Sequence, residues 1–203
     1  MGSVIREFLL CTLIVCSITS SYAQSFCKIE KDYAVFCNYE KAQGVHFKIR
    51  IPRGWTIKEG NRPHIVAKLT PDNSLSSVVV FIDKGETFIS RNQAIEIYDS
   101  GELERVLLEE FTFRQTPIEI VSAENVFIDS YPTRFIISTY TQRLPGQLDS
   151  LDVLNLQWTI FYEDYVIQLN AYIIDELGKD FLQEYYDSIS IPYSLVLFDH
   201  YNL

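Results

Sequence analysis

The sequence has little of what catalytic and metal-binding sites are usually made from. Its 203 residues include three histidines, one methionine and eight glycines. It has no Gly-x-Ser-x-Gly elbow and no glycine-rich phosphate loop, so these marks of serine nucleophiles and nucleotide sites are missing. His46 and His64 have no histidine or cysteine two or four residues away, the spacing of a zinc-binding pair. We therefore expect no catalytic residues, no metal and no cofactor.

Positive charge is also scarce. The chain has 17 lysines and arginines against 27 aspartates and glutamates, a formal net charge of -10. An acidic surface repels phosphate backbones and anionic lipids. The balance therefore argues against nucleic acid and a membrane surface as partners, and weakly favours a basic protein.

Apolar runs are short, and the one at the N-terminus has a recognisable pattern. Arg6 precedes an apolar run from Phe8 to Val15, and small and polar residues then lead to Ala23. This is typical of a cleavable signal peptide, which predicts cleavage after Ala23, a periplasmic or secreted chain and no integral membrane segment after cleavage. A membrane anchor needs about 20 apolar residues, more than this run offers. A lipoprotein signal at Cys16 is a third interpretation. The residue before a lipidated cysteine is usually small, whereas Val15 precedes Cys16.

Cleavage would leave two of the four cysteines. Cys27 and Cys37 lie on two short β-prone segments, residues 25–29 and 33–39. In an oxidising compartment such a pair most simply forms a cross-strand disulfide. A redox role is disfavoured because catalytic dithiols usually occur as Cys-x-x-Cys. The sequence thus predicts an N-terminal disulfide hairpin over residues 25–39.

Two-residue alternation dominates the rest of the chain. It is clearest from Val45 to Ile51, a half-buried strand. Pro52 ends that strand and a turn at Arg53-Gly54-Trp55 follows. Further strands are predicted at residues 64–70, 76–83, 118–128, 133–142, 154–162 and 165–174. The last two strands are separated only by Glu163-Asp164, which predicts a tight hairpin.

Two segments have helical spacing instead. Residues 101–113 form one, with Ser100 as a plausible N-cap, and Ser90-Arg91-Asn92-Gln93 matches a capping box for a shorter helix before it. The other lies between Asp175 and Ser188, and Pro192 is expected to stop it. The order of strands, helix, strands and helix predicts one α+β domain over residues 24–203, with a largely antiparallel sheet covered by helices.

Two parts of this pattern carry a family resemblance. The strand Phe47 to Ile51 ends in the turn Pro52-Arg53-Gly54-Trp55, and the aromatic strand Tyr165 to Tyr172 is followed by a helix over residues 181–190. In these features residues 44–191 resemble the PsbP-like superfamily, named for the extrinsic photosystem II protein. The resemblance implies an α/β/α sandwich and a non-enzymatic role as an assembly factor, adaptor or binding protein. The N-terminal hairpin is outside the family pattern.

Carboxylates and aromatic residues are the remaining candidates for a site. Glu109-Glu110 and Glu163-Asp164 are adjacent acids. Their spacing does not indicate a catalytic pair of carboxylates, so a solvated helix face and a turn are the favoured interpretations. Loop carboxylates at Asp149 and Asp152 could bind calcium, although the EF-hand pattern is missing.

Tyrosine, tryptophan and phenylalanine are favoured at protein interfaces because they bury a large area. The candidate interface residues are Trp55, Tyr172, Phe198 and Tyr201. The C-terminal tail from Ser194 to Leu203 is expected to add an edge strand or to offer apolar surface.

The sequence supports two hypotheses of function. The first is an exported, non-enzymatic binding, assembly or adaptor protein that recognises another envelope or secreted protein. The alternative is a small-ligand carrier, or a carboxylate-dependent hydrolase, with a pocket at the sheet edge. A deep pocket near His64 or the Asp149 loop would favour the alternative.

Overall fold

The computed structural model describes residues 28–37, 39–72, 74–113, 116–143, 150–174 and 181–198. The predicted signal peptide, Cys27 and Tyr201 lie outside these ranges. None of the helices in the described part of the chain is long and apolar enough to cross a membrane.

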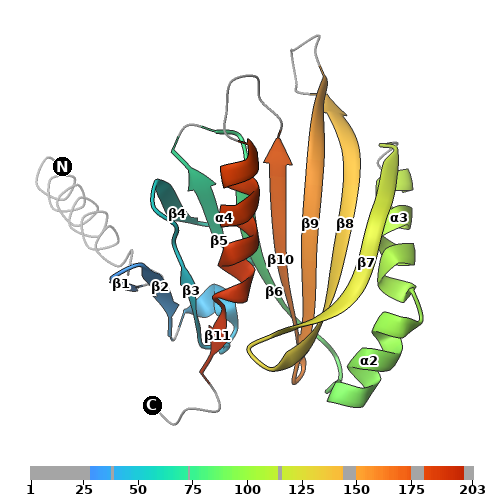
Figure 1. The fold of residues 1–203 in the computed structure, drawn as a ribbon. Helices are drawn as coiled ribbons and strands as arrows, with labels where there is room; N and C mark the ends of the chain where they lie inside the picture. Colours follow the sequence, from blue (N-terminus) through green and yellow to red (C-terminus); the bar gives the residue numbers. More distant parts are fainter. Residues whose placement is uncertain are drawn as a thin grey trace, which may run out of the picture.

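The main sheet has seven strands, and every neighbouring pair is antiparallel. In spatial order these are β4 (Trp55–Glu59), β5 (Ile65–Pro71), β6 (Ser77–Lys84), β10 (Tyr165–Ile174), β9 (Ser150–Tyr162), β8 (Tyr131–Arg143) and β7 (Ile118–Ile128) (Figure 1). The predicted hairpins β5–β6 and β9–β10 are both present. The predicted largely antiparallel sheet is therefore confirmed.

A smaller sheet packs beside the main one. Its order is β1 (Lys28–Glu30), β2 (Tyr33–Phe36), β3 (Phe47–Arg50) and β11 (Val196–Leu197), and a short 3-10 helix, η1 (Glu40–Ala42), joins β2 to β3. The predicted hairpin is present over residues 28–36. The C-terminal tail supplies β11, which pairs with β3 as an added strand.

Helices cover the two faces of the main sheet (Figure 1). On one face, α4 (Phe181–Tyr193) packs against β10, β6 and β3. On the other, α2 (Arg91–Asp99) packs against β8 and α3 (Glu102–Phe113) against β7. The capping box predicted at Ser90 is present, with Gln93 as its partner. The predicted α+β sandwich is thus confirmed.

The hydrophobic core lies on the α4 side of the sheet. Trp158 is at its centre with no exposed surface. Its ring stacks on Phe135 at 4.7 Å between centroids and meets Tyr193 of α4 edge-on. The same buried cluster includes Phe36 and Phe47 of the small sheet. The two sheets therefore share one core.

Several predicted boundaries were wrong. Arg53 and Gly54 form the predicted turn, but Trp55, predicted to be its last residue, begins strand β4, for which no strand was predicted. Ser100 ends α2, although its Oγ also accepts a hydrogen bond from the Glu102 amide of α3. Helix α4 continues past Pro192 to Tyr193. A proline in the last turn removes one backbone hydrogen bond, and the burial of Ile191 and Pro192 offsets this loss. Strand β9 begins at Ser150, four residues before the predicted start at residue 154.

Candidate functional site: an amide-lined cavity

The face of the main sheet opposite the core is polar at its centre. Residues directly opposite each other on antiparallel strands point to the same face. Strand pairing therefore aligns side chains in rows across four strands, and the members on β9 and β10 are polar. One row is Ser138, Asn155, Tyr172 and Ser77, and the next is Ile136, Gln157, Asn170 and Val79.

A third row follows along the same strands, where Thr159 is opposite Gln168 and Gln168 is opposite Phe81. Successive rows are two residues apart, which in a strand corresponds to roughly 7 Å. The three rows thus form an elongated polar floor that runs along β9 and β10.

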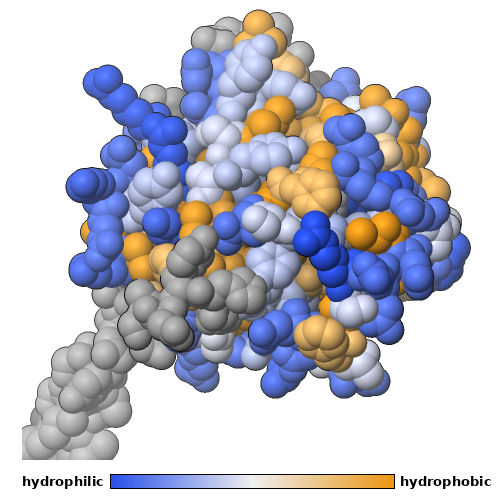
Figure 2. Space-filling view, turned by 60° about the horizontal axis from the view of Figure 1, so that its bottom comes forward, coloured by the Kyte–Doolittle hydropathy of each residue, from blue (hydrophilic) through white to orange (hydrophobic). Residues whose placement is uncertain are grey.

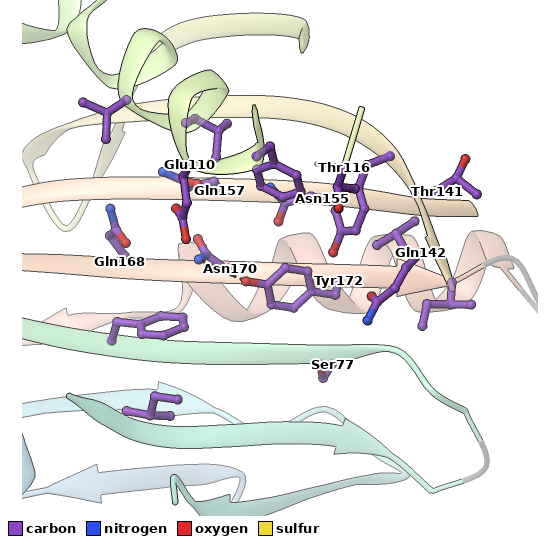
Figure 3. Close-up of a pocket in the computed structure, with 18 of the residues that line it drawn as sticks. Ser77, Glu110, Thr116, Thr141, Gln142, Asn155, Gln157, Gln168, Asn170 and Tyr172 are labelled. Atoms are coloured by element: carbon purple, nitrogen blue, oxygen red, sulfur yellow. Dashed lines mark hydrogen bonds between the residues drawn. The ribbon is translucent and has the colours of Figure 1, made fainter. Parts of the chain in front are cut away.

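Helix α3 covers only part of this floor and leaves a cavity of about 1220 Å³ beside it. In Figure 3, Gln168, Asn170 and Tyr172 lie along β10 at the floor, and Glu110 descends from α3 toward them. Arg62, His64 and residues 140–142 complete the rim. This volume exceeds the range of about 300 to 1000 Å³ typical of small-molecule sites.

An ion pair holds α3 over the sheet. Arg134 of β8 pairs with Glu104 of α3, and both side chains are largely buried. The same guanidinium donates to Asn125 Oδ1 of β7 at 2.8 Å. Such a pair between elements fixes orientation, because either charge would be left buried and unpaired if the other moved. The wall of the cavity therefore has a defined position over the floor.

The walls of the cavity are mainly apolar and aromatic. Leu103, Val106, Leu107 and Phe111 face it from α3, and Phe111 contacts Tyr140 with ring centroids 4.8 Å apart. On the opposite side, His64 stacks on Phe81 at 6.0 Å between ring centroids. The cavity thus combines apolar walls with a polar floor, the usual composition of a ligand site.

The amides of the floor are buried and incompletely paired. Asn155 is 2% exposed and Asn170 is 9% exposed. Their Nδ2 atoms donate to Ser138 Oγ at 3.1 Å and to the Tyr172 hydroxyl at 3.4 Å. Neither Oδ1 atom has a hydrogen-bond partner among the described residues. A buried acceptor without a partner costs about 1 to 3 kcal/mol, which a well-packed apolar residue would avoid.

Charge is low inside the cavity. Among the described lining residues, Arg62 and Glu110 carry a charge at neutral pH, and His64 is also part of the lining. Glu110 is the one carboxylate in this set, whereas glycoside hydrolysis uses two. The geometry therefore gives no support to the carboxylate-dependent hydrolase.

Among the described residues, the acids weighed as candidates form pairs with neighbouring side chains and not a common site. Glu109 pairs with Arg105, and Asp164 with Lys84 at 3.3 Å. Asp152 accepts a hydrogen bond from Thr141 at 3.0 Å, while Asp149 lies outside the described residues. Within the described ranges, no three histidine, cysteine, aspartate or glutamate side chains form a metal-binding group.

The candidate interface residues lie in different environments. Trp55 is 7% exposed in the core, where its Nε1 donates to Asp187 Oδ2 of α4 at 3.2 Å. Tyr172 lies at the floor of the cavity. Phe198 is half-buried beyond β11, with Lys48 Nζ 5.8 Å from its ring centroid. Cys37 is exposed at the end of the hairpin.

The sequence suggested His64 as the place of an alternative pocket and Tyr172 as an interface residue, but the amides of the floor were missed. Their signal was present as Asn155-x-Gln157-x-Thr159 and Gln168-x-Asn170-x-Tyr172. In both strands the intervening residues belong to the core, so the polar members share the other face. Amides at such positions on two central strands indicate a buried polar surface.

Comparisons with known proteins identify the fold. The solution structure of cyanobacterial PsbP (CyanoP) from Synechocystis sp. PCC 6803 matches with a TM-score of 0.55 and 11% identity, over 83% of this chain and 94% of that chain. A crystal structure from Bacteroides thetaiotaomicron VPI-5482 matches with a TM-score of 0.44 and 10% identity, over 74% of this chain and 44% of that chain. No family model and no curated protein matches the sequence. The chain has a PsbP-like fold, as predicted, and fold alone does not determine function.

Proposed function

We propose that the chain is a non-enzymatic binding protein that holds its ligand in the cavity between α3 and the polar face of the main sheet. The observation that best supports it is the composition of the cavity, in which apolar side chains of α3 lie over a floor that includes the half-buried Gln168 and Tyr172. A few polar groups on such a floor can orient a ligand through hydrogen bonds. The apolar walls add contact area.

Export is the second part of the proposal. It rests on the signal-peptide pattern that ends at Ala23. The ligand is then met in the periplasm or outside the cell. We expect mass spectrometry of the mature protein to find Gln24 at its N-terminus.

An adaptor for another protein is the second candidate function. Helix α4 exposes Leu182, Tyr186 and Tyr193 on the side of the molecule opposite the cavity. Aromatic residues of this kind are enriched at interfaces. On the face drawn in Figure 2, hydrophobic residues occur in groups among hydrophilic ones. The net charge of -10 favours a partner with a basic surface.

A ligand screen with a blocked cavity tests the main proposal. Gln168 is half-buried and lines the cavity, so Gln168→Trp should fill space that a ligand needs. Gln183→Trp is the matched control, because Gln183 is exposed on α4 at the other face. We expect ligand-observed NMR with small polar molecules to give hits for wild type and for Gln183→Trp.

The same hits should be lost with Gln168→Trp. An absence of hits with wild type, or equal binding by both variants, would contradict the proposed site. If the protein instead captures one stoichiometric protein partner, and Tyr186→Ala on α4 reduces that binding, the result would favour the adaptor.

A further inference from the structure

We propose that the uncovered part of the main sheet beside α4 binds a basic amphipathic helix of another protein. This surface is on the face opposite the cavity, so the proposal does not depend on a cavity ligand. It rests on the adaptor candidate and gives that candidate a surface and a partner chemistry. The surface, here called the α4–β7 strip, consists of Leu182, Tyr186 and Tyr193 of α4, Ile137 and Leu154 of the sheet, and Glu119 and Glu124 of β7.

The helix layer on this face of the sheet is incomplete. Helix α4 packs against β10, β6 and β3, while α2 and α3 pack on the other face, so no described helix lies over β8 and β7 on the α4 side (Figure 1). Neighbouring strands are about 4.8 Å apart, which places β8 roughly 10 Å from β10. Packed helices are separated by about 8 to 10 Å. The strip therefore has the width that a second helix beside α4 needs.

An apolar stripe of α4 borders this strip. Leu182, Tyr186 and Tyr193 are 64%, 64% and 47% exposed, and their spacing places them on one side of the helix. Tyr193 meets Trp158 of β9 edge-on, with ring centroids 6.5 Å apart. Asp187, on the other flank of α4, accepts a hydrogen bond from β4. The exposed stripe thus lies on the flank of α4 that borders β9.

The strands beside α4 continue the apolar surface. Ile137 of β8 and Leu154 of β9 are half-buried and pack against the core. They belong to adjacent rows of the sheet, since Ile137 is opposite Leu156 and Leu154 is opposite Thr139. An apolar surface of this kind with a polar border is typical of a protein interaction site.

Acids border the strip on its β7 side. Glu124 is opposite Phe135 and Glu119 is opposite Thr139. Phe135 belongs to the core and Thr139 is four residues further along β8, so both acids point to the α4 face. Both are exposed, and β7, β9 and α4 contain no lysine, arginine or histidine. A partner helix therefore gains attraction from basic residues on the flank that faces β7.

A second copy of the chain suits the strip less well. In a symmetric dimer the same patch of each subunit faces the other. The acids of one strip would then meet a surface to which β7, β9 and α4 bring no basic residue. The net charge of -10 adds repulsion between two copies. The charge of the strip thus favours a different protein as the partner.

Selection from a peptide library tests this partner chemistry. The library displays helices of about 18 residues, roughly 27 Å long, in which each surface position is randomised among lysine, glutamate, leucine and serine. It is selected on the mature protein, residues 24–203. We expect the selected peptides to have one apolar face and lysines along one flank.

Substitutions in the strip locate the bound peptide. Tyr186→Ala and Glu124→Lys should each weaken binding of the selected peptide about tenfold in fluorescence anisotropy. Phe88→Ala and Glu96→Lys are the matched controls, because Phe88 precedes α2, Glu96 lies on α2, and both are exposed. Both controls should leave the affinity unchanged. All four positions are exposed, so the variants should fold like wild type.

The contrary outcomes are distinct. Equal weakening by Glu124→Lys and Glu96→Lys would mean attraction to the net charge alone, which overturns the proposal. Selection of acidic helices, or of no helix, overturns it as well. A dimer in sedimentation equilibrium that Tyr186→Ala dissociates would identify a second copy as the occupant and also overturns it. Gln168→Trp blocks the cavity and should leave helix binding unchanged, so the cavity ligand and the helix can fail independently.

Discussion

At the scale of single residues, Tyr98 shows how one side chain fixes a helix to the sheet. It is fully buried, and its hydroxyl lies 3.0 Å from the carbonyl oxygen of Thr159 and 3.2 Å from that of Pro132. The hydroxyl also accepts a hydrogen bond from the Phe161 amide, and the two rings stack at 5.5 Å between centroids. Burial strongly raises the pKa of Tyr98, outweighing the opposite effect of the Phe161 amide.

This raised pKa predicts a loss of stability in alkali. Above about pH 10 the unfolded tyrosine releases its proton while the folded one retains it, so the unfolded state binds fewer protons and the free energy of unfolding falls. Tyr98→Phe removes this dependence. We expect it to be less stable than wild type by about 1 to 2 kcal/mol at pH 8, and the difference to narrow between pH 10 and 11.5.

Urea denaturation across this pH range makes the measurement. Tyr186→Phe is the control, because Tyr186 is exposed on α4 and its loss should leave the pH dependence of wild type unchanged. A stability difference between wild type and Tyr98→Phe that stays constant with pH would show that Tyr98 ionises equally in both states.

At the scale of elements, the N-terminal hairpin has one exposed strand, β1, and one strand packed in the core, β2. All three residues of β1 are exposed, and β1 pairs only with β2 within the described residues. Short hairpins with few buried side chains are marginally stable. A covalent link would therefore matter more here than in the central strands.

The predicted Cys27–Cys37 disulfide gives a test of this hairpin. We expect Cys37→Ser to lower the free energy of unfolding by about 2 to 4 kcal/mol, because the open chain gains conformational freedom when unfolded. Alkylation of the non-reduced mature protein followed by mass spectrometry should detect no free thiol. Labelling of both cysteines before reduction would contradict the prediction, as would an unchanged stability of Cys37→Ser.

Sequence patterns predicted the long elements well and the short or strained ones poorly. Strand β7 was predicted to the residue, since Ile118 to Ile128 lies between a proline and a turn. Strand β4 was missed because only Trp55 of its five residues is buried. A strand with one buried residue shows little of the alternation between apolar and polar residues from which strands are predicted. The end of α4 was misplaced because packing of Ile191 and Pro192 in the core overrode the usual preference of proline.

At the scale of the whole molecule, the cavity could not be predicted from the sequence. Strand periodicity places Asn155 and Asn170 on the non-core face, but their adjacency depends on the pairing of β9 with β10. The cavity also depends on where α3 lies, which the Glu104–Arg134 pair fixes across 30 residues of sequence. Such long-range contacts are set by tertiary packing and leave no local signal.

The shared core predicts that the edge and the centre of the main sheet unfold together. Trp55 and Trp158 report on different regions: Trp55 begins the edge strand β4 and bonds to Asp187 of α4, whereas Trp158 is central in the main sheet. Both belong to one buried cluster that includes Phe36 and Phe47 of the small sheet, so we expect a single cooperative transition.

Two single-tryptophan variants test this expectation. Trp55→Phe leaves the fluorescence of Trp158, and Trp158→Phe leaves that of Trp55. In each variant, the urea midpoint measured by fluorescence should coincide with the midpoint measured by far-UV circular dichroism of the same sample. An earlier midpoint for Trp55 alone would mean that β4 and the neighbouring α4 contacts unfold as a separate unit.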